Sequence, residues 1–255
     1  LTLKIHGRRS DGYHELDSLV VFADEGDRLA LTVGAQPSVN VTGPFASALT
    51  GANLLDKTLA LVREHYPKLS LGAVSLVKEI PVAAGLGGGS ADAAALLRLI
   101  KQANRDSCDG VNWQALATGL GADVPVCMVS RAARMRGTGE KIDLIEAFAP
   151  VAAVIVNAPK SAVPHGKTAR IFSALGARQL PPGFRPRPEA AGAMAIAEII
   201  ARGQNDLEPA ARSLMPQADA ILDVLRASEG VTAVRLSCAG PSCFALYPPE
   251  AHAKK

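Results

Sequence analysis

The sequence predicts a fold of mixed strands and helices in two domains. At 255 residues, the chain is long enough for one large or two ordinary domains, each with its own hydrophobic core. Residues 1–5 alternate apolar and polar side chains, as in a half-buried strand, whereas the apolar residues within 93–100 recur at helical spacing. A new apolar strand follows Pro150, so we predict domains of residues 1–149 and 150–255.

The other expected elements follow from the same two periodicities. We expect strands at residues 20–22, 28–33, 39–41, 74–80, 151–156, 231–236 and 243–247. Asn53 and Asn112 are suited to cap two helices, with inner faces of Leu55, Thr58, Leu59 and Val62 and of Trp113, Leu116, Ala117 and Leu120. Further helical runs follow a proline-rich irregular loop at 180–188, at residues 193–202, 206–213 and 217–227.

Composition excludes several classes of protein. Lys and Arg number 27 against 24 Asp and Glu, and this balance does not suit a nucleic-acid-binding or polybasic membrane protein. No apolar run approaches the roughly twenty residues of a membrane span, and no signal peptide opens the chain. The cysteines lack the CxxC spacing of zinc and redox sites, so we expect reduced thiols in a cytoplasmic protein.

A glycine-rich loop between a predicted strand and a predicted helix is the clearest functional signal. Four glycines occupy the five positions from Gly85 to Gly89, and the helix begins directly after them. Glycines permit φ > 0 and let a ligand approach the backbone, and the N–H groups of a helix's first turn bind phosphate. The alternative is a flexible hinge, which does not need a strand, glycines and a helix in immediate succession.

Two familiar phosphate loops do not fit this segment. A Walker A loop is excluded because no Gly-Lys-Ser/Thr sequence follows the glycines. A Rossmann loop needs glycine where Ser90 stands, and an acidic residue about twenty positions further on. Asp106 and Asp109 are near that spacing, but they follow a helix in a polar loop. We therefore expect a nucleotide-phosphate loop of another family.

An isolated acidic residue, Asp123, lies just before the apolar segment 124–128. Burying a carboxylate without partners costs several kcal/mol. Asp123 therefore binds something, lies in a solvent-accessible cleft, or caps a helix.

Each of two turns has both a purely structural and a functional interpretation. Tyr13 and His14 follow the turn 7–12, where an exposed loop can carry such side chains for solvation alone. The small residues 237–242 fit either a second backbone approach to an anion or a plain hairpin turn.

Four stretches together resemble the GHMP kinases, which include galactokinase and the homoserine, mevalonate and phosphomevalonate kinases. Residues 81–90 are similar to the phosphate loop of this superfamily. Residues 7–14, 120–126 and 237–244 resemble one branch, which acts on a small molecule containing cytidine diphosphate in isoprenoid-precursor synthesis. The resemblance runs nearly from end to end.

The resemblance implies an α+β fold with two domains and the active site in the cleft between them. The N-terminal domain would be ribosomal S5 domain 2-like and the C-terminal domain ferredoxin-like. The implied reaction transfers a phosphoryl group from ATP to a tertiary hydroxyl, with Mg²⁺ bridging the β- and γ-phosphates and no protein ligand assigned to the metal. Asp123 would be the catalytic acid or base. A monomer or a homodimer fits equally, with no nucleic-acid or membrane partner.

On the ATP side, the resemblance places Asn53 and Lys78 near the adenine. The residues that it places around the ATP phosphates are Pro81, Ala83, Ala84, Gly85, Leu86, Gly87, Gly88, Gly89 and Ser90. On the acceptor side, it stacks Tyr13 and Phe172 on the cytosine ring. His14 would form a hydrogen bond with the edge of that ring, and Thr168 would lie near the substrate.

Three departures from the family pattern stand out. The family's lysine-bearing segment is expected before Leu1, because the first strand is already under way there, and Lys4 is out of register for that role. Cys238 and Ala239 replace Gly-Ser in the third motif, so Cys238 is strained or the turn differs if that position needs φ > 0. Residues 164–167 resemble an insertion.

Two other functions stay open from the sequence. A non-catalytic nucleotide-binding module would keep the glycine loop, but it has no use for Asp123 beside the γ-phosphate. Another GHMP small-molecule kinase would explain both the glycine loop and Asp123. Its substrate, such as mevalonate or homoserine, would however need no aromatic platform such as Tyr13 with His14.

Overall fold

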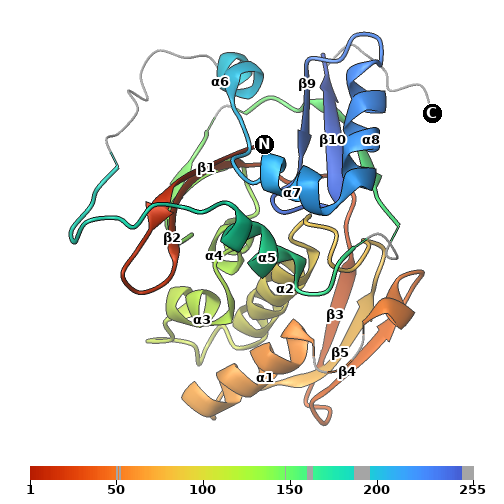
Figure 1. Ribbon diagram of the computed structural model, residues 1–255. Helices are drawn as coiled ribbons and strands as arrows, with labels where there is room; N and C mark the ends of the chain where they lie inside the picture. The colour runs from red at the N-terminus through yellow and green to blue at the C-terminus, as the bar shows by residue number, and fades with distance from the viewer. Residues whose placement is uncertain (50, 52, 147, 160–162, 187–195, 249–255) are drawn as a thin grey trace. The chain divides into compact units, whose positions relative to one another are not determined.

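The computed structural model describes residues 1–49, 51, 53–146, 148–159, 163–186 and 196–248 (Figure 1). The chain divides into two compact units. Unit 1 contains residues 1–21, 84–86 and 132–255, and unit 2 contains residues 22–83 and 87–131. These units do not follow the expected boundary at Pro150, because the first strands belong with the C-terminal part. Domains of residues 1–149 and 150–255 stay a prediction.

The described residues form strands β1 (Thr2–Arg8), β2 (His14–Val20), β3 (Arg28–Val33), β4 (Ser38–Thr42), β5 (Gly72–Val77), β6 (Ala133–Gly137), β7 (Lys141–Leu144), β8 (Ala152–Asn157), β9 (Ala233–Leu236) and β10 (Ser242–Tyr247). The helices are α1 (Leu54–His65), α2 (Gly88–Ala103), α3 (Trp113–Leu120), α4 (Val124–Val129), α5 (Lys167–Ala174), α6 (Ile196–Arg202), α7 (Glu208–Leu214) and α8 (Pro216–Arg226), with a short 3-10 helix η1 (Ala46–Ala48). None of these helices is both long and apolar enough to cross a membrane.

Unit 2 packs helices α1–α4 with one small sheet. The strand order is β3-β5-β4, with β5 antiparallel to β3 and parallel to β4. The buried residues of α1 are Leu55, Thr58, Leu59 and Val62, which confirms the inner face that the sequence predicts. In α2, the predicted Ala93, Leu96, Leu97 and Ile100 are fully buried. Apolar spacing near 3.6 residues thus orients both helices.

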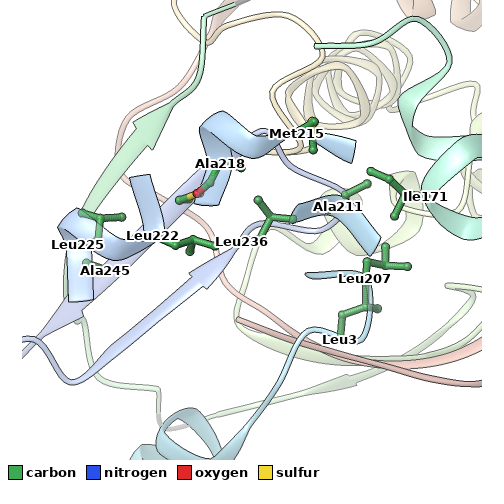
Figure 2. Packing of buried hydrophobic residues seen from close by; sticks show 12 residues of the cluster. Leu3, Ile171, Leu207, Ala211, Met215, Ala218, Leu222, Leu225, Leu236 and Ala245 are labelled. Atoms are coloured by element: carbon green, nitrogen blue, oxygen red, sulfur yellow. The ribbon is translucent and has the colours of Figure 1, made fainter. Parts of the chain in front are cut away.

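Unit 1 contains two antiparallel sheets, with strand orders β1-β2-β6-β7 and β8-β10-β9. Helix α8 lies alongside β9 and β10 (Figure 1). Its Leu222 and Leu225 pack with Leu236 of β9 and Ala245 of β10, as Figure 2 shows. This cluster also contains Met215, at the junction of α7 and α8, and Ala239 of the turn between β9 and β10, so the turn packs on this hydrophobic core.

Most predicted elements are confirmed, with three differences. The strand expected at 20–22 lies at 14–20, because its polar residues hide the alternation. The strand expected at 74–80 ends at Val77. The apolar segment after Asp123 is helix α4, which begins with a proline in its first turn. The expected helical start at 193–195 and the end of the expected loop at 187–188 lie outside the described residues.

Leu222→Ala should destabilise unit 1 by about 2–5 kcal/mol, because it leaves a cavity in a fully buried position. Val224 lies on the same helix but is 72% exposed, so Val224→Ala should change the free energy of unfolding by less than about 0.5 kcal/mol. Urea unfolding of both variants measures this. Equal effects would contradict the packing of α8.

Candidate active site

The glycine loop requires glycine at two positions. Gly85 has φ 80°, and a Cβ on it would lie 2.5 Å from the Gly240 carbonyl oxygen and 2.7 Å from that of Ser237. Gly87 has φ 72° and is the N-cap residue of α2. Side chains are therefore strained at both positions, and at Gly85 there is no room for one.

A turn near the C-terminal end of the chain holds the loop within unit 1. The Ser237 hydroxyl donates to the Gly85 carbonyl at 2.9 Å, and the Ser242 N–H donates to the Ala84 carbonyl at 3.0 Å. The turn joins the antiparallel strands β9 and β10, so the hairpin is confirmed. Cys238 has φ 49°, as expected if the departure from glycine strains this position.

Helix α2 begins in unit 2 with an open N-terminus. No side chain caps it, so the N–H groups of Gly88, Gly89 and Ser90 are available to a ligand. The helix is 16 residues long, and its dipole adds partial positive charge at this end. Together these features suit a phosphate group.

A buried ion-pair network lies beside the first turn of α2. The Lys78 ammonium is 3% exposed and contacts the carboxylates of Asp27 and, at 2.9 Å, Asp92. Asp27 also accepts hydrogen bonds from the two backbone N–H groups that follow Lys78. A Cβ on Gly88 would lie 3.3 Å from Lys78 Nζ, so the ammonium lies close to the start of the helix.

Two members of this network, Asp92 and Lys78, are constrained further by burial and by backbone hydrogen bonds. Burial raises the pKa of Asp92 to about 6, against the attraction of Lys78, and the charge of Asp27 adds to the rise. The backbone of Lys78 is also engaged, because its N–H donates to Thr42 at 2.7 Å and its carbonyl accepts from Phe45 at 3.2 Å. A contact between Lys78 and adenine stays a prediction.

Asp123 lies at the start of α4, in unit 2, and is exposed. It occupies the N-cap position, but its side chain makes no capping hydrogen bond, so the interpretation as a capping residue is wrong. Desolvation by surrounding protein raises the pKa of its carboxyl, although the residue still reaches solvent. The residue is therefore exposed although its carboxyl is partly desolvated, and its side chain does not cap the helix.

Helix α4, which Asp123 precedes, packs against α2. Arg98 of α2 donates to the Cys127 carbonyl at 2.6 Å. Burial raises the pKa of the Cys127 thiol to about 12, and the Asp123 carboxylate adds to the rise, as does Asp92 more weakly, whereas Arg98 opposes it. Cys127 is thus within electrostatic reach of acidic residues on both helices.

In unit 1, the structure brings together two of the residues predicted for the cytosine side. The ring centroids of His14 and Phe172 are 4.7 Å apart, at an interplanar angle of 39°. Partial burial and the nearby Arg8 lower the pKa of His14, which favours a neutral imidazole. Tyr13 is 63% exposed, and Thr168 is exposed on α5. Their contacts with a substrate stay predictions.

Asn53 caps α1, as the sequence predicts. Its side-chain oxygen accepts hydrogen bonds from the N–H groups of Leu55 at 2.8 Å and Asp56 at 3.1 Å. The Asp56 carboxylate in turn accepts from the Asn53 N–H, which completes a capping box. The adenine contact of Asn53 stays a prediction.

Several buried polar residues around the loop were not predicted from the sequence. Asp92 falls in register with the buried Leu96 and Ile100 of α2, which signals a paired acid on an apolar face. Asp27 lies in an irregular segment before β3, where no period could reveal it. The described residues contain no group of three or more His, Cys, Asp or Glu side chains that could hold a metal ion.

Comparison with known proteins identifies the class. Family profiles described as "GHMP kinases N terminal domain" and "GHMP kinases C terminal" match residues 53–131 and 190–255. The α+β fold and its glycine loop are those of a GHMP kinase.

Relatives that match this chain over its whole length identify the family within the GHMP kinases. A 4-diphosphocytidyl-2-C-methyl-D-erythritol kinase of Bradyrhizobium sp. strain BTAi1 is 45% identical over 268 residues, covering 100% of this chain and 86% of the relative. One from Rhodopseudomonas palustris is 42% identical over 268 residues, covering 100% and 87%. A crystal structure of 4-(cytidine 5'-diphospho)-2C-methyl-D-erythritol kinase has a TM-score of 0.68 and 32% identity, covering 96% of this chain and 85% of that one. The chain therefore belongs to the 4-diphosphocytidyl-2-C-methyl-D-erythritol kinase family of the GHMP kinases.

Wild type should lose stability as the pH rises from 3.8 to about 6, and Asp92→Asn should abolish this loss. The folded protein holds a proton on Asp92 in this window, whereas the unfolded chain has lost it, so wild type loses stability as the pH rises. The loss is on the order of 1 kcal/mol or more, because each pKa unit corresponds to about 1.4 kcal/mol.

Urea unfolding across this pH range, compared with wild type and with the exposed-site variant Asp106→Asn, measures the effect. An unchanged pH dependence in Asp92→Asn would contradict the burial-raised pKa of Asp92.

Proposed function

We propose that the chain transfers the γ-phosphoryl group of ATP to the 2-hydroxyl of 4-diphosphocytidyl-2-C-methyl-D-erythritol, a step towards isoprenoid precursors. The observation that carries the proposal is Asp123, an exposed residue whose side chain does not cap the helix that it precedes, because this helix, α4, packs against the uncapped phosphate helix α2. The names of the full-length relatives support the choice of substrate.

The loop and helix α2 bind the nucleotide phosphates in this proposal. Backbone N–H groups of Gly88, Gly89 and Ser90 donate to phosphate oxygens, and the helix dipole stabilises their negative charge. Mg²⁺ bound with the nucleotide would supply charge neutralisation at the phosphates. Because the described residues contain no acidic cluster, an ion held mainly by phosphate oxygens and water fits the chain.

Asp123 accepts the proton of the acceptor hydroxyl as the new O–P bond forms. The acceptor is a tertiary alcohol and a crowded nucleophile, so most of the rate comes from positioning and electrostatics. A raised carboxyl pKa makes Asp123 a stronger base than an ordinary aspartate, although the residue stays accessible to the substrate.

The cytosine ring stacks on Tyr13 and Phe172 in this proposal. The neutral His14 beside Phe172 is suited to form a hydrogen bond with the edge of the base. Thr168 is on the same helix as Phe172, one turn earlier, and contacts the substrate. The protein acts in the cytoplasm, as a monomer or a homodimer.

A coupled assay of ADP formation tests the function directly. We expect turnover with 4-diphosphocytidyl-2-C-methyl-D-erythritol and none above background with mevalonate or homoserine. Turnover with mevalonate or homoserine instead would favour another GHMP kinase. ATP binding without turnover on any of the three would favour a non-catalytic module.

Asp123→Asn should lower kcat by about 100-fold or more, because the amide cannot accept the proton. The Kd for ATP should change little, because in this proposal Asp123 contacts the acceptor hydroxyl and not ATP. Steady-state kinetics and calorimetric ATP binding measure the two quantities, with the exposed Asp106→Asn as the matched control. Near-normal turnover of Asp123→Asn would exclude its catalytic role.

Phe172→Ala and Tyr13→Ala should each raise KM for the cytidine substrate by roughly 5- to 150-fold. This range corresponds to about 1–3 kcal/mol of lost base stacking. The KM for ATP should stay within about twofold in both variants, because the stacking residues do not contact ATP. If both KM values rise together, these rings support the fold instead of the substrate.

A further inference from the structure

Lys167 is a buried lysine without a role in the proposed reaction. It is the first residue of α5 and is 8% exposed. Its ammonium donates to the carbonyl oxygens of Gly240 and, at 3.5 Å, Ala239. Burial lowers the pKa of Lys167, so the protein loses free energy by holding the ammonium there. Removing the ammonium would take this donor away from the Gly240 and Ala239 carbonyls.

The two carbonyls belong to the turn that holds the glycine loop. Gly240 lies directly against Gly85, where a Cβ would come within 2.5 Å of its carbonyl oxygen. On the two sides of Gly240, Ser237 and Ser242 bind the backbone of Gly85 and Ala84. Lys167 is therefore one hydrogen bond away from residues that fix the loop.

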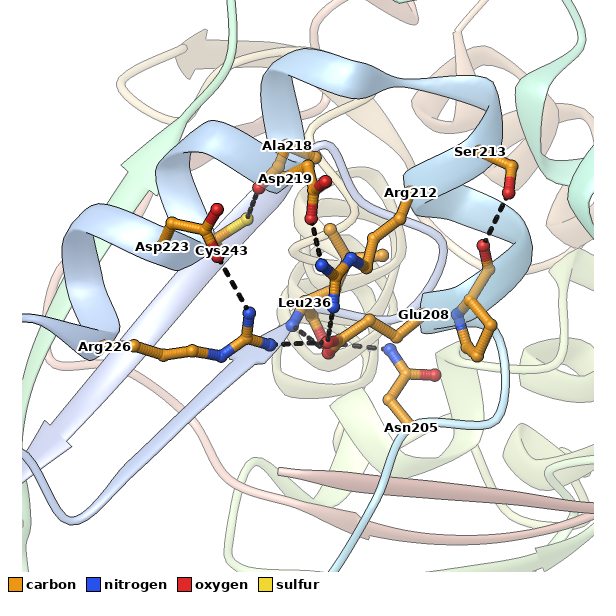
Figure 3. Close-up of polar contacts among 11 residues, drawn as sticks. Asn205, Glu208, Arg212, Ser213, Ala218, Asp219, Asp223, Arg226, Leu236 and Cys243 are labelled. Atoms are coloured by element: carbon orange, nitrogen blue, oxygen red, sulfur yellow. Dashed lines mark hydrogen bonds and ion pairs between the residues drawn. The ribbon is translucent and has the colours of Figure 1, made fainter.

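Other side chains hold the opposite end of the same turn. The Asn205 amide donates to the carbonyls of Leu236 at 2.9 Å and Cys238 at 2.7 Å, and the Glu208 carboxylate accepts from the Leu236 N–H at 3.1 Å. Figure 3 shows Asn205 and Glu208 meeting at Leu236, with Arg226 on the other side of the Glu208 carboxylate. The Leu236 end of the turn is thus fixed without Lys167, whose ammonium holds the Gly240 end.

We propose that Lys167 is a positioning residue for ATP binding. Its ammonium holds the Ala239–Gly240 carbonyls and so keeps the turn where it binds the loop backbone. The proposal rests on the proposed function in one respect, the binding of ATP phosphates by the loop. Because α5 also carries Thr168 and Phe172, Lys167 connects the predicted acceptor-side helix with the ATP loop.

Lys167→Met removes the charge and keeps the chain length. We expect its Kd for ATP, measured by calorimetry without acceptor, to rise about tenfold or more, the scale of a lost hydrogen bond to a charged group. The variant should stay folded with a melting temperature lower by only a few degrees, and KM for the cytidine substrate should stay close to that of wild type. Lys167→Gln keeps a donor for the carbonyls and should retain most of the ATP affinity. Arg170→Met, an exposed cation on the same helix, should behave as wild type.

A double-mutant cycle with Ser237→Ala tests the route of the effect. Both changes act through one turn, so their effects on ATP affinity should be less than additive. Additive effects, an unchanged ATP Kd in Lys167→Met, or failure of that variant to fold would each overturn the proposal. A wild type that binds ATP but does not phosphorylate the cytidine substrate would contradict the proposed function instead, and the ATP-binding comparison would still decide the role of Lys167.

Discussion

The Ser237 hydroxyl binds the carbonyl of Gly85 across 152 positions of sequence, and the glycine loop depends on this contact. The backbones of the loop and the turn approach each other closely because residue 85 has no Cβ. The Ser242 N–H adds a second hydrogen bond, to Ala84. A glycine-rich segment alone would sample many conformations, so tertiary contacts within unit 1 give this one its shape.

Electrostatics shapes the part of the site in unit 2. Helix α2 presents free N–H groups at its start, and the Lys78 ammonium lies beside the first turn. Asp27 and Asp92 balance that ammonium, and burial raises the pKa of Asp92 against the attraction of Lys78. Burial also raises the pKa of Asp123, although the residue remains exposed. Burial thus raises the pKa of both carboxyl groups, of which only Asp92 is paired with Lys78.

Sequence periodicity predicted the parts of the fold that a single element determines. The inner faces of α1 and α2 follow from apolar spacing, and Asn53 indicates where α1 begins. Helix α4 could not be predicted in this way, because six apolar residues with a proline near the start have no readable period. The strain at Cys238 was foreseeable because glycine is the family residue there.

The polar network around the loop was not predictable from the sequence. Lys167, Asn205 and Ser237 are far apart along the chain, and only the folded unit brings them to one turn. Their residue types also occur commonly on surfaces, so nothing local marks them as buried. The catalytic candidate was easier to identify, since an acid before an apolar segment conflicts with its neighbours.

The position of the new phosphate is the most direct test of the account. Proton-coupled ³¹P NMR of the product of 4-diphosphocytidyl-2-C-methyl-D-erythritol and ATP reports which hydroxyl was phosphorylated. We predict a phosphomonoester signal without three-bond coupling to hydrogen, because the tertiary carbon at position 2 carries none. A coupled doublet or triplet would place the phosphate on a secondary or primary hydroxyl and contradict the proposed reaction.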